Sequence, residues 1–596
     1  MPKFRDQSPV VRSAFLGTTQ IQSMRTMGWA GGWAADKQTA HVGLNEVDYI
    51  TNYNWTESFT LERRGGHERV TTSVAGLEAA EQLHILNVET AASLTAQPSF
   101  TQEVLNFNDT DSEVWYSTMG LLLEEERDGT GADMAYSGEA IGPWDKTLTN
   151  YFRTFNIESV VFEEFIYITS LRFGGFTGTN TAATHDASST GASLAIKVDV
   201  LNDTWTRPVA HALDGSDGGF PSARCLLAEY DRIFAANLYK MSGYRYPSRI
   251  YWSTVDENGT HPETWGADSY IDVGVDDGSE ITQLLAMGDS ILIFKNDKTY
   301  MLLGTDPDTF ELHNISPRFG TRSSQGAVEH KGKAYFFDQS QGLMSYDGAN
   351  FVNVSRPINK YMLKDIGFNR EADFKVNVQN VDDRIFVSIP IGSDIDDIVA
   401  RTFVYDTKLD VWTQWSTGIP SMIVEAQTDH SFTGVGLAGT GDHFFGSPEG
   451  EIGMFRLEGT TSTDELVAGN RTVVAQMNTG WISPGELGSR YRLRRLDLLT
   501  GSYNESDCDI TLFKDLNASD AWQTATFDPD GSLDAWQHQD VSFDGDNMFT
   551  WLSLQFIQNE GTNLNAALLG YQMNISSRPF QRGTQANLNI APDGSS

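Results

Sequence analysis

Short runs of apolar residues, separated by turns rich in Asp, Asn or Gly, repeat through the middle of the chain. Between residues 156 and 460, each unit pairs two apolar runs and often adds an aromatic residue near its end. Six units are recognisable, with the paired runs Phe162–Ile168 and Ala195–Val200, Cys225–Ala228 and Ile233–Ala236, Ile281–Met287 and Ile291–Phe294, Gly326–Glu329 and Ala334–Asp338, Phe374–Val378 and Ile385–Ile389, and Gly434–Ala438 and His443–Gly446. One small sheet cannot bury both of its faces, whereas sheets stacked around an axis can. The pattern predicts a β-propeller of about six blades over residues 156–460.

The segments that flank this repeat carry other patterns. Residues 461–585 contain about seven strand-like runs, and some alternate apolar and polar positions, as in Tyr491–Arg494. Such alternation is typical of half-buried strands and predicts a C-terminal β-sandwich. We expect residues 1–75 to form an arm with the first strands, and residues 586–596 to form a polar tail.

Residues 76–155 are the least regular part of the sequence. Ala79–Val88 and Leu121–Arg127 are compatible with short helices, so we predict a small irregular or mixed insertion domain. The expected fold class is therefore all-β, with a β-propeller core, an additional β-sandwich domain and a small mixed domain near the N-terminus.

The charge of the chain is strongly negative. Its 596 residues include 42 Lys and Arg against 80 Asp and Glu, a formal net charge of −38. Such a surface repels nucleic acid and anionic membranes. Two interpretations stay open: the charge serves solubility, including in a salty environment, or it forms the wall of a channel past which DNA slides without sticking.

The sequence nominates no catalytic, cofactor-binding or metal-binding residue. Its eleven His form no zinc-binding pair, and no nucleophile elbow, phosphate-binding loop or dinucleotide fingerprint is present. Ser253–Trp265 is loosely similar to the sialidase Asp-box, which is a structural turn. We therefore predict that the chain is not an enzyme and uses no cofactor. A propeller hydrolase or lyase would need a pocket of Arg or carboxylate side chains, and Arg249, Arg318, Arg322 and Arg356 form no such pattern.

Other candidate features favour structural explanations. Cys225 and Cys508 are far apart in sequence and predict buried thiols, with no disulfide. Asp528–Asp534 offers oxygen ligands for calcium but lacks a bidentate Glu, and Asp214–Gly219 and Asp544–Asp546 are weaker, so solvated turns are favoured for all three. No apolar run approaches the roughly 18 residues of a membrane-spanning helix. We expect a protein that is made in a cytoplasm and stays soluble until it joins an assembly.

Two stretches resemble a known family. Near the start these are Gly43–Asn45, Asp48, Asn52–Trp55 and Leu61–Gly66; the longer stretch includes Arg249–Ser253, Trp265, Gly278–Ile281, Leu292–Lys295, Tyr300–Gly304, Gly320–Thr321 and Gly342–Gly348. The first is similar to the opening of tail proteins of short-tailed phages. The second is similar to the propeller of tail nozzle proteins (tail hub, or tubular B-type) of podoviruses.

This resemblance implies a structural virion protein that is assembled in the host cytoplasm and resides in the phage tail. It implies a homo-hexameric ring below the portal and adaptor, which extends the channel for DNA ejection and carries tail fibres. Asp272, Asp276, Asp277 and Glu280 form the densest acidic cluster near a predicted blade edge and are candidates for the channel lining, with a solvated loop as the alternative. The alternative function is a peripheral or receptor-binding propeller that recognises host-surface glycans.

Overall fold

The structure of the chain is a computed structural model with two compact units. It describes residues 12–16, 19–69, 80–90, 99–108, 114–118, 157–162, 165–170, 196–199, 204–206, 213, 218–239, 245–255, 265–363, 376–390, 400–417, 419, 424–425, 443–446, 454–457, 463–466, 469–484, 490–502, 508–527, 535–541, 548–559 and 566–578. One unit comprises Met1–Gly65, Leu409–Thr413 and Thr472–Ser596, and the other comprises Gly66–Lys408 and Gln414–Arg471. Strands make up nearly all regular structure in these ranges, which confirms the all-β class.

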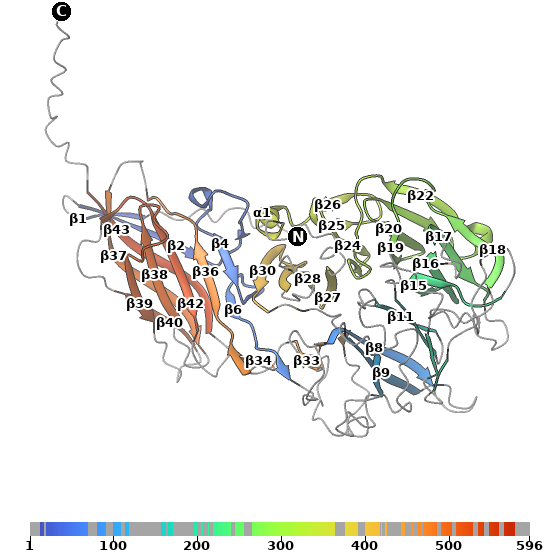
Figure 1. Ribbon diagram of the computed structural model, residues 1–596. Coiled ribbons are helices and arrows are strands. Elements are labelled where there is room, and N and C mark those ends of the chain that lie inside the picture. Colours follow the sequence, from blue (N-terminus) through green and yellow to red (C-terminus); the bar gives the residue numbers. More distant parts are fainter. Residues whose placement is uncertain are drawn as a thin grey trace, which may run out of the picture. The chain divides into compact units, whose positions relative to one another are not determined.

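The larger unit is built from small sheets in which consecutive strands pair (Figure 1). The four-stranded sheets are β11 (Ile157–Phe162), β12 (Phe165–Ser170), β13 (Ile196–Asp199) and β14 (Thr204–Thr206); β15 (Ser222–Glu229), β16 (Arg232–Tyr239), β17 (Arg245–Ser253) and β18 (Trp265–Asp272); β19 (Ile281–Met287), β20 (Ser290–Lys295), β21 (Thr299–Leu303) and β22 (Glu311–Ser316); β23 (Ala327–His330), β24 (Lys333–Asp338), β25 (Gly342–Tyr346) and β26 (Phe351–Asn353); β27 (Asn377–Val381), β28 (Arg384–Pro390), β29 (Ala400–Asp406) and β30 (Val411–Trp415); and β31 (Val424–Glu425), β32 (His443–Gly446), β33 (Met454–Arg456) and β7 (Glu68–Arg69). These six sheets correspond to the six units expected from the sequence.

The first strands of successive sheets lie against one another. β11 contacts β15, β15 contacts β19, β19 contacts β23, and β23 contacts β27. The first strands are therefore the innermost strands of a ring of sheets, as in a β-propeller. The β-propeller predicted from the sequence is confirmed.

A three-stranded sheet of β8 (Ala80–Thr90), β9 (Ser99–Asn108) and β10 (Val114–Thr118) joins this ring. β8 contacts β11 on one side and β31 and β32 on the other, so the sheet occupies a blade position between them (Figure 1). The helix expected over Ala79–Val88 is wrong, because this segment pairs antiparallel with β9 from Ala80 to Thr90. Cross-strand pairing overrides the helix propensity of its Ala, Glu, Gln and Leu residues. The second expected helix, at residues 121–127, lies outside the described residues.

An early strand completes the last sheet. β7 pairs with β33, so that Arg69 faces Phe455 and Glu68 faces Arg456. The preceding His67 is fully buried; its backbone N–H donates to Asp464 Oδ1 at 2.9 Å, and its Nδ1 lies 2.6 Å from the Leu457 carbonyl oxygen. A side chain at Gly66 would overlap the backbone of Thr463. β7 is thus held in place by the His67 ring, the Asp464 carboxylate and the close packing of Gly66 against the Thr463 backbone.

Aromatic residues fill the gaps between blades. Trp265 of β18 packs edge-on against Phe220, with 5.3 Å between ring centroids, and Phe220 stacks on Tyr167 of β12 at 5.1 Å. Phe294 of β20 packs on Phe336 of β24 at 5.0 Å. Large aromatic rings therefore pack beside aliphatic residues in the interior between blades.

The second unit consists of two sheets. The first contains β1 (Arg12–Leu16), β2 (Thr19–Met27), β43 (Ala566–Arg578), β37 (Arg490–Ser502) and β40 (Ala535–Val541), with β41 (Met548–Phe549), β6 (Leu61–Arg63) and β5 (Tyr53–Trp55) attached; the second contains β3 (Gly32–Trp33), β4 (Glu46–Thr51), β36 (Ala475–Thr479), β42 (Leu552–Gln558), β38 (Cys508–Lys514) and β39 (Gln523–Phe527). Tyr571 of the first sheet packs on Phe556 of the second, with ring centroids 6.1 Å apart. This arrangement confirms the predicted β-sandwich, and N-terminal strands complete both of its sheets.

Candidate functional site

The four acidic residues selected from the sequence lie where the sheet β15–β18 connects to the sheet β19–β22. Asp272 ends β18, and Asp276, Asp277 and Glu280 lie on the connection to β19. Asp272 accepts hydrogen bonds from Arg249, at 2.6 Å from Nε and 2.8 Å from Nη2. Three of the four carboxylates take part in ion pairs, whereas Asp276 is exposed. Their place in a channel lining stays a prediction, but most of their charge is compensated locally.

Asp277 holds a buried lysine. Lys295 Nζ donates to Asp277 Oδ1 at 2.8 Å, and to Ser248 Oγ and the Gly274 carbonyl oxygen, both at 3.1 Å. Tyr300 donates its O–H to Asp277 Oδ2 at 3.2 Å. Burial lowers the pKa of Lys295. Burial is the largest single effect on Asp277 and opposes its ionisation, but the hydrogen bonds from Lys295 and the Ser279 backbone, together with the charges of Lys295 and Lys298, outweigh it, so the pKa of Asp277 is lowered. The pair fixes the connection against β20.

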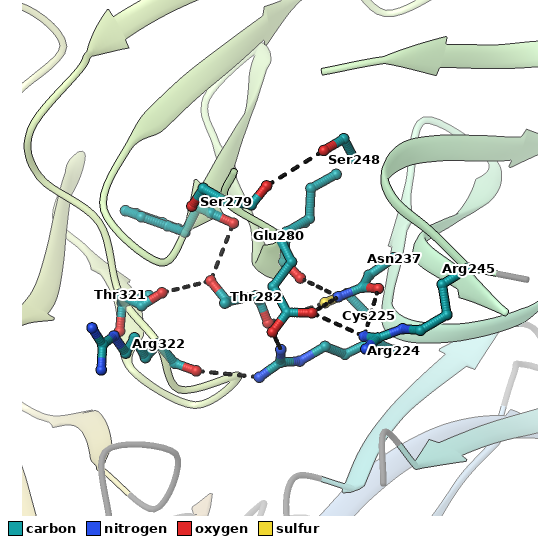
Figure 2. Close-up of polar contacts among 12 residues, drawn as sticks. Arg224, Cys225, Asn237, Arg245, Ser248, Ser279, Glu280, Thr282, Thr321 and Arg322 are labelled. Atoms are coloured by element: carbon teal, nitrogen blue, oxygen red, sulfur yellow. Dashed lines mark hydrogen bonds and ion pairs between the residues drawn. The ribbon is translucent and has the colours of Figure 1, made fainter. Parts of the chain in front are cut away.

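Arg224 of β15 lies at the centre of a polar cluster that joins several blades (Figure 2). Its side chain is buried, its Nη1 lies 3.4 Å from Glu280 Oε1, and its Nη2 donates to the Arg322 carbonyl oxygen at 3.2 Å. Arg245 of β17 contacts the other oxygen of Glu280 at 2.9 Å. Burial lowers the pKa of Arg224, since the charged form loses hydration. Glu280 thus bridges a buried arginine and a partly exposed one.

A β-bulge places a further polar side chain in this cluster. Pairing between β16 and β17 shifts between Ala236 and Leu238, and Asn237 at that point has a φ of +57°. Its Nδ2 donates to the Ile281 carbonyl oxygen at 2.8 Å and to Glu280 Oε2 at 3.2 Å. A non-glycine residue in this conformation costs about 1–3 kcal/mol, which the surrounding contacts must offset. The bulge orients the Asn237 side chain toward β19 of the next blade.

Glu158 of β11 is a second acidic neighbour of Arg224. Its Oε2 accepts the Leu226 backbone N–H of β15 at 3.0 Å, and its Oε1 is inaccessible and accepts no hydrogen bond. Burial raises the pKa of Glu158 to about 8, although the Leu226 hydrogen bond and the charge of Arg224 both lower it. At neutral pH this carboxyl is therefore mostly uncharged.

One loop, residues 321–326, contacts several of these groups. Residues 321–326 precede the innermost strand β23, and the Arg322 carbonyl oxygen accepts a hydrogen bond from Arg224 of β15, while Ser324 lies near Glu158 of β11. Thr282 of β19 donates to the Thr321 carbonyl oxygen at 2.6 Å. This loop therefore links the innermost strands of neighbouring blades at one end of the propeller.

The cluster contains two carboxyl groups in contrasting environments, the buried Glu158 and the partly exposed Glu280. Such contrast is the starting point of acid–base chemistry, although here both groups also tie blades together.

No group of three or more His, Cys, Asp or Glu side chains that could hold a metal ion occurs in the described ranges. Among those same residues, no helix is long and apolar enough to cross a membrane. The calcium-binding alternative at residues 528–534 falls outside them.

Sequence reasoning missed Arg224 and Glu158. Arg224 interrupts the apolar strand Ser222–Glu229, and a charged residue between apolar neighbours is a signal of a buried ion pair. Its partners cannot be found from the sequence, because they lie 66 positions earlier and 56 positions later in the chain. Arg249 and Arg322, which formed no pattern in the sequence, both contribute contacts to this region.

No family model and no curated protein matches the chain. Among solved structures, it is similar to an exo-β-1,3-galactanase from Phanerochaete chrysosporium, at 7% identity over 88% of this chain and 98% of that chain, with a TM-score of 0.23. It is also similar to an arabinoxylan arabinofuranohydrolase of glycoside hydrolase family 43 from Bacillus subtilis, at 10% identity over 94% of each chain, with a TM-score of 0.23. A third is AztD from Citrobacter koseri, at 11% identity over 62% of this chain and 86% of that chain, with a TM-score of 0.26.

These neighbours correct one expectation. The prediction that the chain is not an enzyme is wrong as a conclusion from its architecture, because glycoside hydrolases are among the structures that resemble it. The likeness concerns the fold alone and assigns no reaction, substrate or catalytic residue to this chain.

Proposed function

We propose that the chain is a structural virion protein of a short-tailed phage, which forms the tail nozzle as an oligomeric ring. The ring extends the DNA-ejection channel below the portal and adaptor. The proposal draws on the resemblance of Arg249–Gly348 to nozzle propellers. Its partners are further copies of the chain, with a hexamer expected, the portal and adaptor assembly, tail fibres and the passing genome. In the cell it is made in the cytoplasm and ends in the virion tail.

The observation that carries the proposal is the acidity of the propeller unit. Residues 66–408 and 414–471 hold 58 of the 80 acidic residues and 28 of the 42 basic ones. A duplex that moves past such a surface finds few cations with which to exchange its counterions, so it is not retained. An acidic ring therefore suits a conduit for DNA better than a surface that binds it.

The contacts of residues 321–326 support a conduit that lies between copies of the chain. The loop contacts the innermost strands of neighbouring blades at one end of the propeller, which favours a channel enclosed by several copies over one through a single propeller. A nozzle built from this chain would enclose its channel among several subunits, which is why a homo-oligomer belongs to the proposal.

A cryo-EM reconstruction of the purified particle that contains this chain tests the proposal. Six copies around an axial channel below the head are expected. Copies at the periphery, away from any channel, would contradict the nozzle and favour the alternative of a receptor-binding propeller that recognises host-surface glycans. Turnover on a panel of polysaccharides would instead reveal a glycan-cleaving enzyme.

A further inference from the structure

His330 is the last residue of β23 and is buried in the propeller. It is 6% exposed, and its Nε2 is inaccessible and has no hydrogen-bond partner within the described part of the chain. A neutral imidazole with its proton on Nδ1 buries only a lone pair at Nε2, whereas an imidazolium buries an N–H and a positive charge. Burial lowers the pKa of His330, and the charge of Lys331 lowers it further, while Glu329 acts in the opposite direction. The uncharged ring is therefore the form that fits this position.

The His330 ring belongs to a row of aromatic side chains that crosses from one blade to the next. Its centroid lies 6.4 Å from that of Tyr335 on β24, and the Tyr335 centroid lies 6.4 Å from that of Tyr405 on β29. Both tyrosines are buried. The row therefore joins the sheet β23–β26 to the sheet β27–β30, with His330 at one end.

A tight turn beside the ring is tied to the same neighbouring sheet. Lys331 and Gly332 both have a positive φ, of +51° and +76°, as in the two-residue turns that suit the twist of a β-hairpin. Lys331 forms an ion pair with Asp383, which lies in the turn between β27 and β28. The tip of the β23–β24 hairpin is thus held against the next blade by the row of rings and by one ion pair.

The described strands that pack against β23 place no carboxylate near a charged His330. β19 and β27 carry no titratable side chain. β24 places Lys333 directly opposite His330, and its one carboxylate, Asp338, lies at the far end of the strand. Apart from the Tyr335 ring, the titratable group that these strands bring to His330 is therefore a second cation.

Two other carboxylates near this turn are engaged elsewhere. Glu329 precedes His330 on the strand, so its side chain points to the opposite face of the sheet, and its Oε1 accepts the Gly332 backbone N–H. Asp383 is paired with Lys331. A proton on His330 would therefore add a positive charge beside two lysines.

We propose that His330 is an acid-sensitive switch, which holds the tip of the β23–β24 hairpin against the next blade when neutral and releases it when protonated. On protonation the ring must turn toward water, because no described group accepts the Nε2–H. That movement removes one end of the row of rings, and repulsion from Lys331 and Lys333 favours it. Since the folded state lowers the pKa of His330, the contact is intact above the ordinary pKa of histidine and is lost as pH falls from there through the folded pKa.

Amide hydrogen exchange of the full chain, measured by mass spectrometry at pH 7.5 and pH 5 and corrected for intrinsic rates, tests the proposal. Peptides that cover residues 327–335 and 400–406 should exchange about threefold faster at pH 5, whereas the hairpin of residues 281–295 should not. His330→Gln stays neutral and should remove the response. His313→Gln, at an exposed histidine on β22, should keep it.

Glu158 cannot produce this response, because its protonation stabilises the folded propeller in acid. A second measurement needs no variant: exchange of the imidazole C2 proton follows the titration of His330 in the unaltered chain. His330 should titrate at a lower pH in the folded chain than in the urea-unfolded chain. Exchange at the tip that does not change with pH, a response that survives in His330→Gln, or an equal or higher titration midpoint in the folded chain would each overturn the proposal.

Discussion

Glu158 Oε2 accepts the backbone N–H of Leu226 at 3.0 Å, and this bond joins the innermost strands of two adjacent blades. Its geometry leaves the other carboxyl oxygen in an inaccessible position without a hydrogen bond. A carboxyl group placed in this way tolerates burial as an uncharged acid. The stability of the propeller should therefore depend on the protonation state of Glu158.

Stability of the propeller should fall as pH rises toward 8. Burial raises the pKa of Glu158 from 4.5 to about 8, so the folded state binds one proton more than the unfolded state between these values. The free energy of unfolding then decreases with rising pH by up to about 1.4 kcal/mol per pH unit, and the contribution is fully present only below the unfolded pKa. Glu158→Gln should flatten this dependence in urea denaturation between pH 5 and 8, whereas the exposed Asp289→Asn should not. A slope that Glu158→Gln leaves intact would assign the titration to another group.

Removal of Arg224 should destabilise the propeller unit strongly. Arg224→Met leaves Glu280 without its buried partner and removes the tie to the Arg322 carbonyl. Breaking a buried pair in this way costs about 3–5 kcal/mol. The exposed Arg318→Met provides the matched control, with a change within about 0.5 kcal/mol. Equal denaturation midpoints for the two variants would show that the cluster carries no stability.

The coupling of Lys295 to Asp277 can be measured directly. Lys295→Met and Asp277→Asn should each destabilise the fold, and the double variant should lose less than the sum, because each single change leaves a buried charge behind. Thermal denaturation of the four proteins gives the coupling energy. Strict additivity would contradict a direct interaction between Nζ and Oδ1.

Gly66→Ala should loosen the closing strand. An added methyl group would meet the Thr463 backbone, which cannot move without disturbing the adjacent contact of His67 with Asp464. We expect lower stability and faster proteolytic cleavage near residues 66–69. Gly43→Ala is the comparison, because the atoms nearest to its added methyl group belong to the side chains of Asn45 and Glu46. Similar cleavage of both variants would exclude a special role for the approach at Gly66.

The sequence predicted the architecture well where the pattern was local. Apolar runs around two-residue turns, such as Gly288–Asp289 between β19 and β20, revealed the blades because both strands and the turn lie within a short window. The closing strand β7 could not be found in this way, because two residues carry no periodicity and the partner lies nearly 390 positions later. The same holds for Arg224 with Glu158 and Glu280, whose proximity depends on three separate blades. The acidic cluster was visible in the sequence, whereas the cations that compensate it come from β15, β17 and β20.

Closure of the propeller by β7 sets an order of events during synthesis. Glu68 and Arg69 leave the ribosome early, but Met454–Arg456, to which they pair, emerge only after more than three hundred further residues. The sandwich faces the same delay, because β2 near the start pairs with β43 near the end. Blades made in between can form their own hairpins as they appear, whereas both units wait for the last part of the chain. Contacts at such separation are slow to form, so a ribosome that stalls before residue 454 would release a ring with an open edge strand, the kind of surface that aggregates.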